Sequence, residues 1–192
     1  MYVRDARNRD EAWLLDHIEE MGLDDTAFRS RDYVIAVDDE SSTRAGFGRF
    51  RVHREDDACE LTSIGVLDGW RGQGVGAHVI ERLLRNAGIE GYERVFALAP
   101  AHEYLAQFGF RPVEESELPE SLRDRLAEKR ERHDTVVPMV IDADRFRMPD
   151  RLRDRFKQAA ETAEPAEEEE PPESPEDFGI DPEEATYKYD TG

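Results

Sequence analysis

The sequence predicts a single α/β domain built on a mixed sheet, followed by an acidic C-terminal tail. Three features predict it: short apolar strands joined by polar turns, a glycine-rich loop between a strand and an amphipathic helix, and later strands that alternate with helices. A chain of 192 residues is long enough for one domain with a substantial core. We expect this domain over residues 1–145, a surface helix over 146–160 and a disordered tail over 161–192.

The first expected elements are a short strand over residues 2–4 and a helix. Asn8 or Asp10 offers an N-cap for this helix, and Gly22 ends it. Its apolar residues recur at helical spacing: Trp13, Leu14, Ile18 and Met21. A second short helix is expected over residues 25–31.

The middle of the chain predicts an antiparallel meander. Strands are expected over residues 33–37, 45–53 and 59–67, because short runs of polar turn residues separate these apolar stretches. The glycine-rich loop follows the third strand, and the helix after it is expected over residues 75–86, ending near Gly88.

The next stretch alternates strands with helices. The strand over residues 94–98 follows a helical crossover, so we expect it to pair in parallel with an earlier strand. The remaining expected elements are a helix over 101–108, a strand over 109–113, a helix over 118–132 and a strand over 135–141.

The glycine-rich loop carries the chemical signal of the sequence. Glycines at positions 72, 74 and 76 let the backbone approach a ligand closely. The first N–H groups of the following helix have no internal partner and carry partial positive charge, which suits a phosphate or a diphosphate. Arg71 adds a full positive charge. We therefore predict an anion site over residues 71–77.

Several interpretations of this loop compete. A P-loop requires Gly-Lys-Ser/Thr, which this stretch lacks. The dinucleotide fingerprint G-x-G-x-x-G/A fits residues 72–77 loosely, with Glu93 at a suitable distance, but the loop does not follow Leu67 directly. A turn without a ligand would not need three glycines. Taken as one unit, residues 71–76 (RGQGVG) resemble the R/Q-x-x-G-x-G/A acyl-CoA loop of the GNAT superfamily of N-acyltransferases.

A later segment carries a second resemblance. Residues 97–113, ALAPAHEYLAQFGFRPV, followed by Leu118 and Pro119, are similar to the acetyltransferase domain of N-acetylglutamate synthases. The likeness covers most of residues 59–119. The cysteines that follow Leu-Pro in those domains are missing from residues 120–133, so the resemblance does not extend to a glutamate substrate.

This resemblance implies a GNAT fold with splayed central strands, acetyl-CoA as co-substrate and no metal. It implies transfer of the acetyl group to a primary amine by direct attack on the thioester. The strand backbone at Ile64, Gly65 and Val66 is expected to hydrogen-bond the acyl carbonyl and the pantetheine arm. The residues expected to bind the diphosphate are Arg71, Gly72, Gln73, Gly74, Val75, Gly76 and Ala77.

Two side chains are candidates for proton transfer. The amine has to lose a proton before it attacks, and Glu60, near the start of the strand before the loop, is the candidate general base. In the family, a tyrosine four residues before the glycine of Gly-Phe protonates the leaving thiolate. That position is Leu105 here, and Tyr104 lies about 100° away around a helix. We predict Tyr104 as the general acid. The structural alternative for Glu60 is an ordinary exposed carboxylate on a strand, and the alternative for Tyr104 is an aromatic side chain of the core or of a lid.

The expected acceptor is an amino acid or another small metabolite. Two alternatives stay open: a protein N-terminus or lysine as acceptor, and an acyl-CoA-binding module without turnover, which Leu105 favours.

Composition restricts the location and the partners. The formal net charge is −20, and thirteen acidic residues against one lysine follow Gln158, which disfavours binding to nucleic acid or membranes. Abundant Asp and Glu with only three lysines is typical of cytoplasmic proteins from halophiles. No stretch approaches the ~20 apolar residues of a membrane span. We expect a cytoplasmic protein whose partner is a small-molecule amine, and a homodimer is compatible with the sequence.

Other polar residues give weaker signals. His78 and His102 have no second ligand at metal spacing, and His78 is expected on the helix surface. Cys59 lacks the partners of a catalytic thiol, so a small buried role is expected. Three arginines of the second meander strand are expected on a solvated face: Arg49, Arg51 and Arg54.

Overall fold

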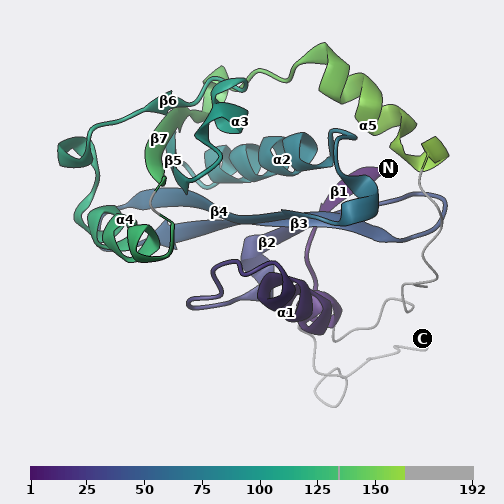
Figure 1. The fold of residues 1–192 in the computed structure, drawn as a ribbon, viewed down its shortest axis with the longest axis horizontal. Coiled ribbons are helices and arrows are strands. Elements are labelled where there is room, and N and C mark those ends of the chain that lie inside the picture. Colours follow the sequence, from purple (N-terminus) through teal and green to yellow (C-terminus); the bar gives the residue numbers. More distant parts are fainter. Residues whose placement is uncertain (134, 163–192) are drawn as a thin grey trace, which may run out of the picture.

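The computed structural model describes residues 1–133 and 135–162, which form a mixed seven-stranded sheet with helices on both faces (Figure 1). The strand order is β1-β2-β3-β4-β5-β7-β6. Only the β4–β5 pair is parallel among these neighbours. The strands are β1 (Tyr2–Asp5), β2 (Tyr33–Val37), β3 (Arg44–His53), β4 (Ala58–Val66), β5 (Arg94–Ala99), β6 (Arg111–Pro112) and β7 (Val137–Asp142). The α-helices are α1 (Glu11–Glu20), α2 (Val75–Ile89), α3 (His102–Ala106), α4 (Glu120–Arg132) and α5 (Asp150–Thr162).

The mixed α/β fold and the parallel crossover through α2 confirm the predicted architecture. The main difference lies in residues 25–31, where a helix was expected and the structure has a turn and the start of a 3-10 turn at Ser30–Asp32. Ala27 adopts φ +51°, which a helix does not allow. The carbonyls of Thr26 and Ala27 accept hydrogen bonds from the Arg49 guanidinium instead, at 2.9 and 2.6 Å.

Strand β2 is buried on both faces because helices cover both sides of the sheet. Its alternate residues enter two different hydrophobic clusters. Val34 and Ala36 pack in the cluster that contains α2. Tyr33, Ile35 and Val37 pack in the cluster that contains α1. This explains why β2 reads as a continuous apolar run.

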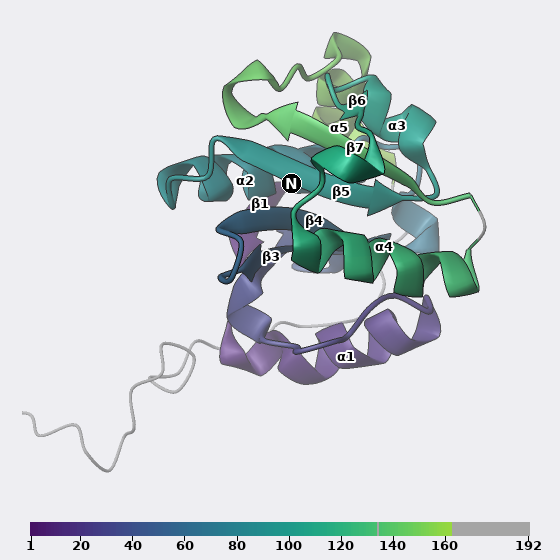
Figure 2. The same ribbon diagram turned by 90° about the vertical axis from the view of Figure 1, so that its left-hand side faces the viewer.

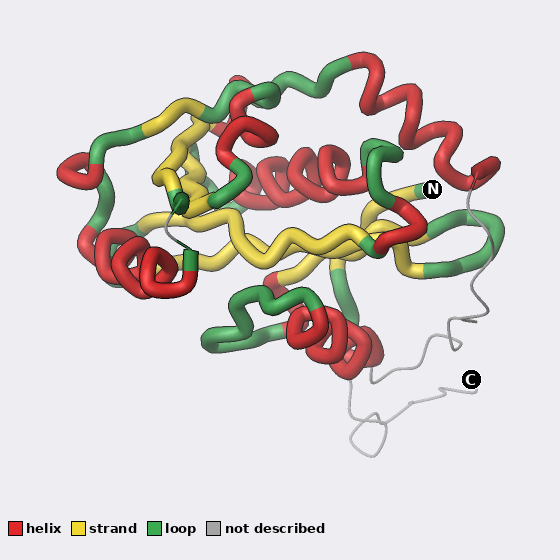
Figure 3. The backbone as a smooth tube through the Cα atoms, viewed as in Figure 1, coloured by secondary structure: helices red, strands yellow, loops and turns green. Residues whose placement is uncertain are grey.

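Helix α2 lies close against the sheet. A Cβ atom built at Gly48 of β3 would come within 2.6 Å of the Val79 side chain, so glycine is needed for this approach. Four apolar residues of α2 face the sheet: Val79, Ile80, Leu83 and Leu84. After β4, the chain passes through a 3-10 turn, Asp68–Trp70, and the glycine-rich loop into α2 (Figure 3).

Helix α4 covers the face of the sheet opposite to α2, as α1 does (Figure 2). Its residues Leu122 and Leu126 are fully buried in a cluster with Phe96, Leu98 and Val140 of β5 and β7. Helix α4 therefore lies beneath β5 and β7.

Helix α5 is part of the packed structure. Leu152, Phe156 and Ala159 are buried in the same cluster as α2. The packed structure thus continues past residue 145, where the sequence predicts the domain to end, because these three residues form one apolar stripe in a charged helix. From residue 163 onward, the expected acidic tail lies outside the described residues. Within the described ranges, no helix has the length and apolar character to cross a membrane.

Candidate active site

The central parallel strands β4 and β5 diverge halfway along their length. Their pairing ends at Leu61 and Ala97, although β4 continues to Val66 and β5 to Ala99. On its other side β4 pairs with β3, and there the register shifts where Ser63 adopts φ +49°. An extra residue of this kind is a β-bulge, which bends and twists the strand that contains it. The bulge accounts for the separation of the two strands.

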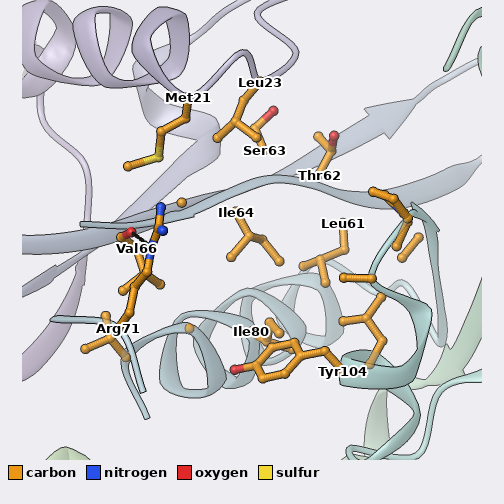
Figure 4. A pocket seen from close by; sticks show the side chains of 18 of the residues that line it. Met21, Leu23, Leu61, Thr62, Ser63, Ile64, Val66, Arg71, Ile80 and Tyr104 are labelled. Atoms are coloured by element: carbon orange, nitrogen blue, oxygen red, sulfur yellow. Dashed lines mark hydrogen bonds between the residues drawn. The ribbon is translucent and has the colours of Figure 1, made fainter. Parts of the chain in front are cut away.

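A pocket of about 1260 Å³ opens where these strands diverge. Its walls come from the last residues of β4, the end of β5, the glycine-rich loop, the segment after α1, and helices α3, α4 and α5. Ile64 and Tyr104 lie on the α2 side, and Met21, Leu23 and Ser63 lie on the α1 side (Figure 4). The pocket therefore connects the predicted anion site to the opposite face of the sheet.

The loop at one end of the pocket has the geometry of an anion site. Gly72 and Gly74 adopt φ +75° and +80°, which favour glycine. Within the described part of the chain, no hydrogen bond is recorded for the backbone N–H groups of Gly74, Val75, Gly76 and Ala77. These groups stand at the start of a 15-residue helix, whose dipole adds partial positive charge.

Arg71 stands exposed at the mouth of this end of the pocket. Its Nε donates to the Val66 carbonyl at 3.2 Å, and its Nη1 lies 2.9 Å from the Asp68 carboxylate (Figure 4 shows Arg71 beside Val66). Both contacts tie the guanidinium to the end of β4. They hold a full positive charge next to the unpaired amides of the loop.

The three strand residues predicted to contact the acyl group line this pocket: Ile64, Gly65 and Val66. They lie beyond the last residue of β4 that pairs with β5, so the edge of β4 facing away from β3 is open to the pocket there. A Cβ atom at Gly65 would lie 2.6 Å from the Phe47 ring and 2.7 Å from Met21 Sδ. Glycine at position 65 is therefore required by the packing of α1 against β3 and β4.

Glu60 is fully buried and is surrounded by cationic side chains. Its Oε2 lies 3.0 Å from His53 Nε2 and accepts from Arg125 Nε at 2.6 Å. Its Oε1 accepts from Lys129 Nζ at 3.0 Å. Burial raises the pKa of this carboxyl, but hydrogen bonds from His53 and Arg125 and the charges of Lys129 and Arg125 outweigh it and hold the pKa far below its usual range. A carboxylate kept ionised so strongly is a poor acceptor for the proton of an amine, so the geometry favours a structural role for Glu60.

Two of the residues that hold Glu60, Arg125 and Lys129, come from helix α4, and the sequence did not identify them as neighbours of Glu60. Arg125 also pairs with Asp24, and Lys129 Nζ donates to Leu98 O at 3.3 Å and Thr62 Oγ1 at 3.4 Å. Lys129 therefore joins β4 and β5 at the point where they separate. The available signal was the i, i+4 spacing of Arg125 and Lys129 next to the apolar stripe of α4.

Tyr104, the predicted general acid, lies at the wall of the pocket. Its hydroxyl oxygen is 3.2 Å from the position of a Cβ atom at Gly76, near Val66 (Figure 4). Burial raises the pKa of the Tyr104 phenol, which keeps it protonated at neutral pH. Leu105 is buried, with 5 % of its surface exposed, and belongs to the cluster that contains α2. Leu105 therefore takes the buried position of α3, and Tyr104, one residue earlier, faces the pocket.

Two expectations about other polar residues are wrong. His78 is half-buried under α5, where its ring stacks on Phe156 with centroids 3.8 Å apart, and burial lowers its pKa. Arg49 is only 1 % exposed because the carbonyls of residues 26 and 27 and the Asp32 carboxylate satisfy its guanidinium. The sequence predicts both side chains at the surface because the residues that cover them are distant in the chain, and the local pattern does not reveal those contacts.

Cys59 gives a prediction for the folded chain. It is fully buried in β4, and burial raises the pKa of its thiol to about 12. Because the thiolate is the reactive form, we expect less than about 1 % of the native chain to react with a thiol-specific disulfide reagent at pH 8 within minutes. Addition of denaturant should release one equivalent per chain. Rapid labelling of the native chain would contradict this burial.

Comparison with known proteins gives a direct match. Residues 2–110 match the sequence profile of the Acetyltransferase (GNAT) family. This range includes the first five strands, α1, α2, α3 and the glycine-rich loop.

Solved structures share the fold. The N-acetylglutamate synthase of Neisseria gonorrhoeae, complexed with coenzyme A and N-acetyl-glutamate, is 24 % identical with a TM-score of 0.59, and the match covers 72 % of this chain and 34 % of that one. Rv2747 of Mycobacterium tuberculosis, in complex with CoA and NLQ, is 20 % identical with a TM-score of 0.60, covering 74 % and 99 % of the two chains. A GNAT-family acetyltransferase of Staphylococcus aureus is 12 % identical with a TM-score of 0.57, covering 73 % and 98 %. The chain thus spans about a third of the Neisseria enzyme.

Proposed function

Since the chain belongs to the GNAT family of acetyltransferases, we propose that it transfers the acetyl group of acetyl-CoA to the primary amine of an amino acid or another small metabolite. The observation that supports this most is the pocket between the diverging strands β4 and β5. It has the unpaired amides of residues 74–77 at one end and charged side chains from α4 and the end of α1 at the other. A thioester is already activated, so such a site has to position two reactants and stabilise charge, without a nucleophilic side chain.

In this proposal, the glycine-rich loop binds the diphosphate of acetyl-CoA. The free amides at the start of α2 and the Arg71 guanidinium supply hydrogen bonds and positive charge. The pantetheine arm then runs between β4 and β5. The backbone of residues 64–66, open to the pocket, hydrogen-bonds the arm and the acyl carbonyl, and a backbone N–H near Val66 stabilises the oxyanion that forms during attack.

The acceptor enters from the other end of the pocket. There the walls carry Arg132 and His133 from the end of α4 and the residue after it, and Glu20 and Asp24 from the segment around the end of α1. An amino acid carries both charges at neutral pH, so cationic and anionic walls suit it. The pocket is also about 1260 Å³, which leaves room for a small acceptor beside the pantetheine arm.

The acceptor ammonium first loses one proton, and the neutral amine nitrogen then attacks the thioester carbon. As the C–S bond breaks, the nitrogen loses a second proton and the CoA thiolate gains one. We assign protonation of the thiolate to the Tyr104 hydroxyl, which faces the pocket and stays protonated at neutral pH. The protons of the amine go to water in the open pocket, because hydrogen bonds from His53 and Arg125 and the charges of Lys129 and Arg125 hold Glu60 ionised.

Replacement of Tyr104 by phenylalanine tests this assignment. Loss of a general acid is expected to lower kcat by about 100-fold with little change in the KM for acetyl-CoA, because the ring still fills the same space. Tyr92, which lies outside this pocket, provides the matched control, and Tyr92→Phe should leave kcat unchanged. If Tyr104→Phe keeps the wild-type kcat, the CoA thiolate takes its proton from solvent and not from Tyr104.

A thiol-release screen tests the function itself. The chain is incubated with acetyl-CoA and a panel of amino acids, polyamines and peptides with free N-termini in high salt, and free CoA is measured with a disulfide reagent. The buried Cys59 should not contribute to this signal. We expect release with amino acids or other small amines. Release only with peptides would favour a protein acetyltransferase, and acetyl-CoA binding without release for any amine would favour a non-catalytic module.

A further inference from the structure

Helix α5 contributes to the same pocket from outside the region that matches the family. The match ends at residue 110, whereas α5 runs over Asp150–Thr162. Its buried stripe is anchored in the α2 cluster through Leu152, Phe156 and Ala159. On another side of the same helix, Arg151 and Arg155, one helical turn apart, line the pocket at its loop end.

The contacts of α5 fix it against the glycine-rich loop. Arg155 Nη1 donates to the Gly72 carbonyl at 3.1 Å. The Leu152 carbonyl lies so close to Gly74 that a Cβ atom there would be 2.2 Å away. The ring of Phe156 stacks on His78, in the first turns of α2. The helix therefore lies in direct contact with the loop and with the start of α2.

Helix α5 also reaches the opposite side of the pocket mouth. Arg151 Nη2 donates at 2.6 Å to the side-chain oxygen of Gln107, the residue that ends α3. Through Arg151 and Arg155 the helix thus connects α3 to the loop across the end of the pocket where the diphosphate is proposed to bind. Both arginines are exposed and use one recorded hydrogen bond each, so most of their N–H groups still point to solvent in the described structure.

The charge at this mouth is opposite to that of the whole chain. The chain carries a formal net charge of −20, which repels a ligand that carries several phosphate charges. Among the described residues that line the loop end of the pocket, however, the charged side chains are Arg71, Arg151 and Arg155 against Asp68 alone. A local excess of guanidinium groups in an acidic protein is the arrangement that binding of a polyanion requires.

We propose that α5 completes the acyl-CoA site, and that Arg151 and Arg155 bind phosphate groups of the nucleotide end of acetyl-CoA. This inference rests on the proposed function, since it concerns the same pocket. Arg71 and the loop amides bind the diphosphate from one side, and the two arginines of α5 bind phosphate oxygens from the other. The helix thereby acts as a binding element of this chain that the family match does not include.

The test compares two acetyl donors. Acetyl-CoA carries the phosphates, and S-acetylpantetheine carries the same thioester without them. For the variant Arg151→Gln/Arg155→Gln we expect kcat/KM with acetyl-CoA to fall about 30-fold or more, through KM, because charge-assisted hydrogen bonds to phosphate are lost. We expect kcat/KM with S-acetylpantetheine to stay within twofold of wild type. A merely structural role of the arginines would lower both values together.

Arg153 gives the matched control on the same helix. It pairs with Glu81 of α2 at 3.1 Å and does not line the pocket. Arg153→Gln removes the same charge from the same helix, and it should leave the kcat/KM for acetyl-CoA within about twofold of wild type. The proposal is overturned if the double variant keeps the wild-type KM for acetyl-CoA, if both donors are affected equally, or if Arg153→Gln has the same effect. If the wild-type chain neither binds acetyl-CoA in a calorimetric titration nor releases CoA, the proposed function itself fails, which is a distinct result.

Discussion

Replacement of Glu60 by glutamine is expected to lower the free energy of unfolding by about 3–5 kcal/mol at neutral pH. The carboxylate is fully buried, and three basic side chains surround it. Glutamine has a similar shape but carries no charge, so it leaves buried cations without compensation. For a chain of this size, the melting temperature should fall by roughly 6–20 °C.

The effect should depend on pH in a defined direction. The pKa of Glu60 in the folded chain lies far below its ordinary value of 4.5. The ionised carboxylate therefore stabilises the folded state fully above about pH 4.5, and this contribution is lost as the pH falls towards the folded pKa. The difference in unfolding free energy between wild type and Glu60→Gln should be largest near pH 7 and smaller at pH 3.5.

Denaturant titrations at both pH values measure this difference, and Glu128→Gln provides the control. Glu128 is exposed on the same helix as Lys129, so its replacement should change stability by less than about 0.5 kcal/mol. A different result would support the general-base role that the sequence suggests for Glu60. In that case Glu60→Gln keeps wild-type stability but loses turnover, and the pH profile of wild-type activity follows a carboxyl group that titrates near neutral pH.

The second large effect is expected from Gly74→Ala. Gly74 adopts φ +80°, and its added Cβ would meet the Leu152 carbonyl at 2.2 Å. The loop, α5 or both have to move to relieve this contact. Because displacement of a binding group by about 1 Å can cost 100-fold, we expect kcat/KM for acetyl-CoA to fall by about that factor.

Gly72→Ala separates the contact from the backbone strain. Gly72 has a similar φ of +75°, but no atom lies within 4 Å of its added Cβ. Both variants share a strain of about 1–2 kcal/mol, but only Gly74→Ala displaces α5. Steady-state kinetics with acetyl-CoA should therefore show a much smaller loss for Gly72→Ala, and equal losses would mean that the contact with α5 does not matter.

The same contact changes how a charged substitution at this position is interpreted. Gly74→Glu would place a carboxylate where the diphosphate is proposed to bind, and this charge would repel the ligand. In the structure any side chain at position 74 meets α5 first. Loss of binding in Gly74→Glu would therefore not distinguish repulsion of the diphosphate from displacement of the helix.

The sequence predicts those parts of the molecule that depend on local pattern. Strands β2 and β4 follow from apolar stretches that polar turn residues separate, and α2 follows from helical periodicity after the glycines. The anion-site geometry at Gly72 and Gly74 also follows from local chemistry, since both need positive φ. In these cases the residues that form the feature are neighbours in the chain.

The parts that the sequence did not predict depend on contacts between distant residues. Arg125 and Lys129 surround Glu60 from 65 and 69 residues away, so the strong depression of its pKa is not visible in the strand alone. Helix α5 was expected at the surface because charged residues outnumber its apolar ones. Its position against Gly74 depends on the fit of Leu152 and Phe156 to α2, which only the assembled fold determines.

The central claim is that the loop at the start of α2 binds the diphosphate of acetyl-CoA. Calorimetric titration of the full chain in high salt with acetyl-CoA and, separately, with NAD tests it most directly, because the competing dinucleotide interpretation of the same glycines predicts the opposite preference. The structure and the family predict saturable binding of acetyl-CoA at a single site and no measurable binding of NAD. Binding of NAD in place of acetyl-CoA, or no heat with acetyl-CoA, would contradict the account.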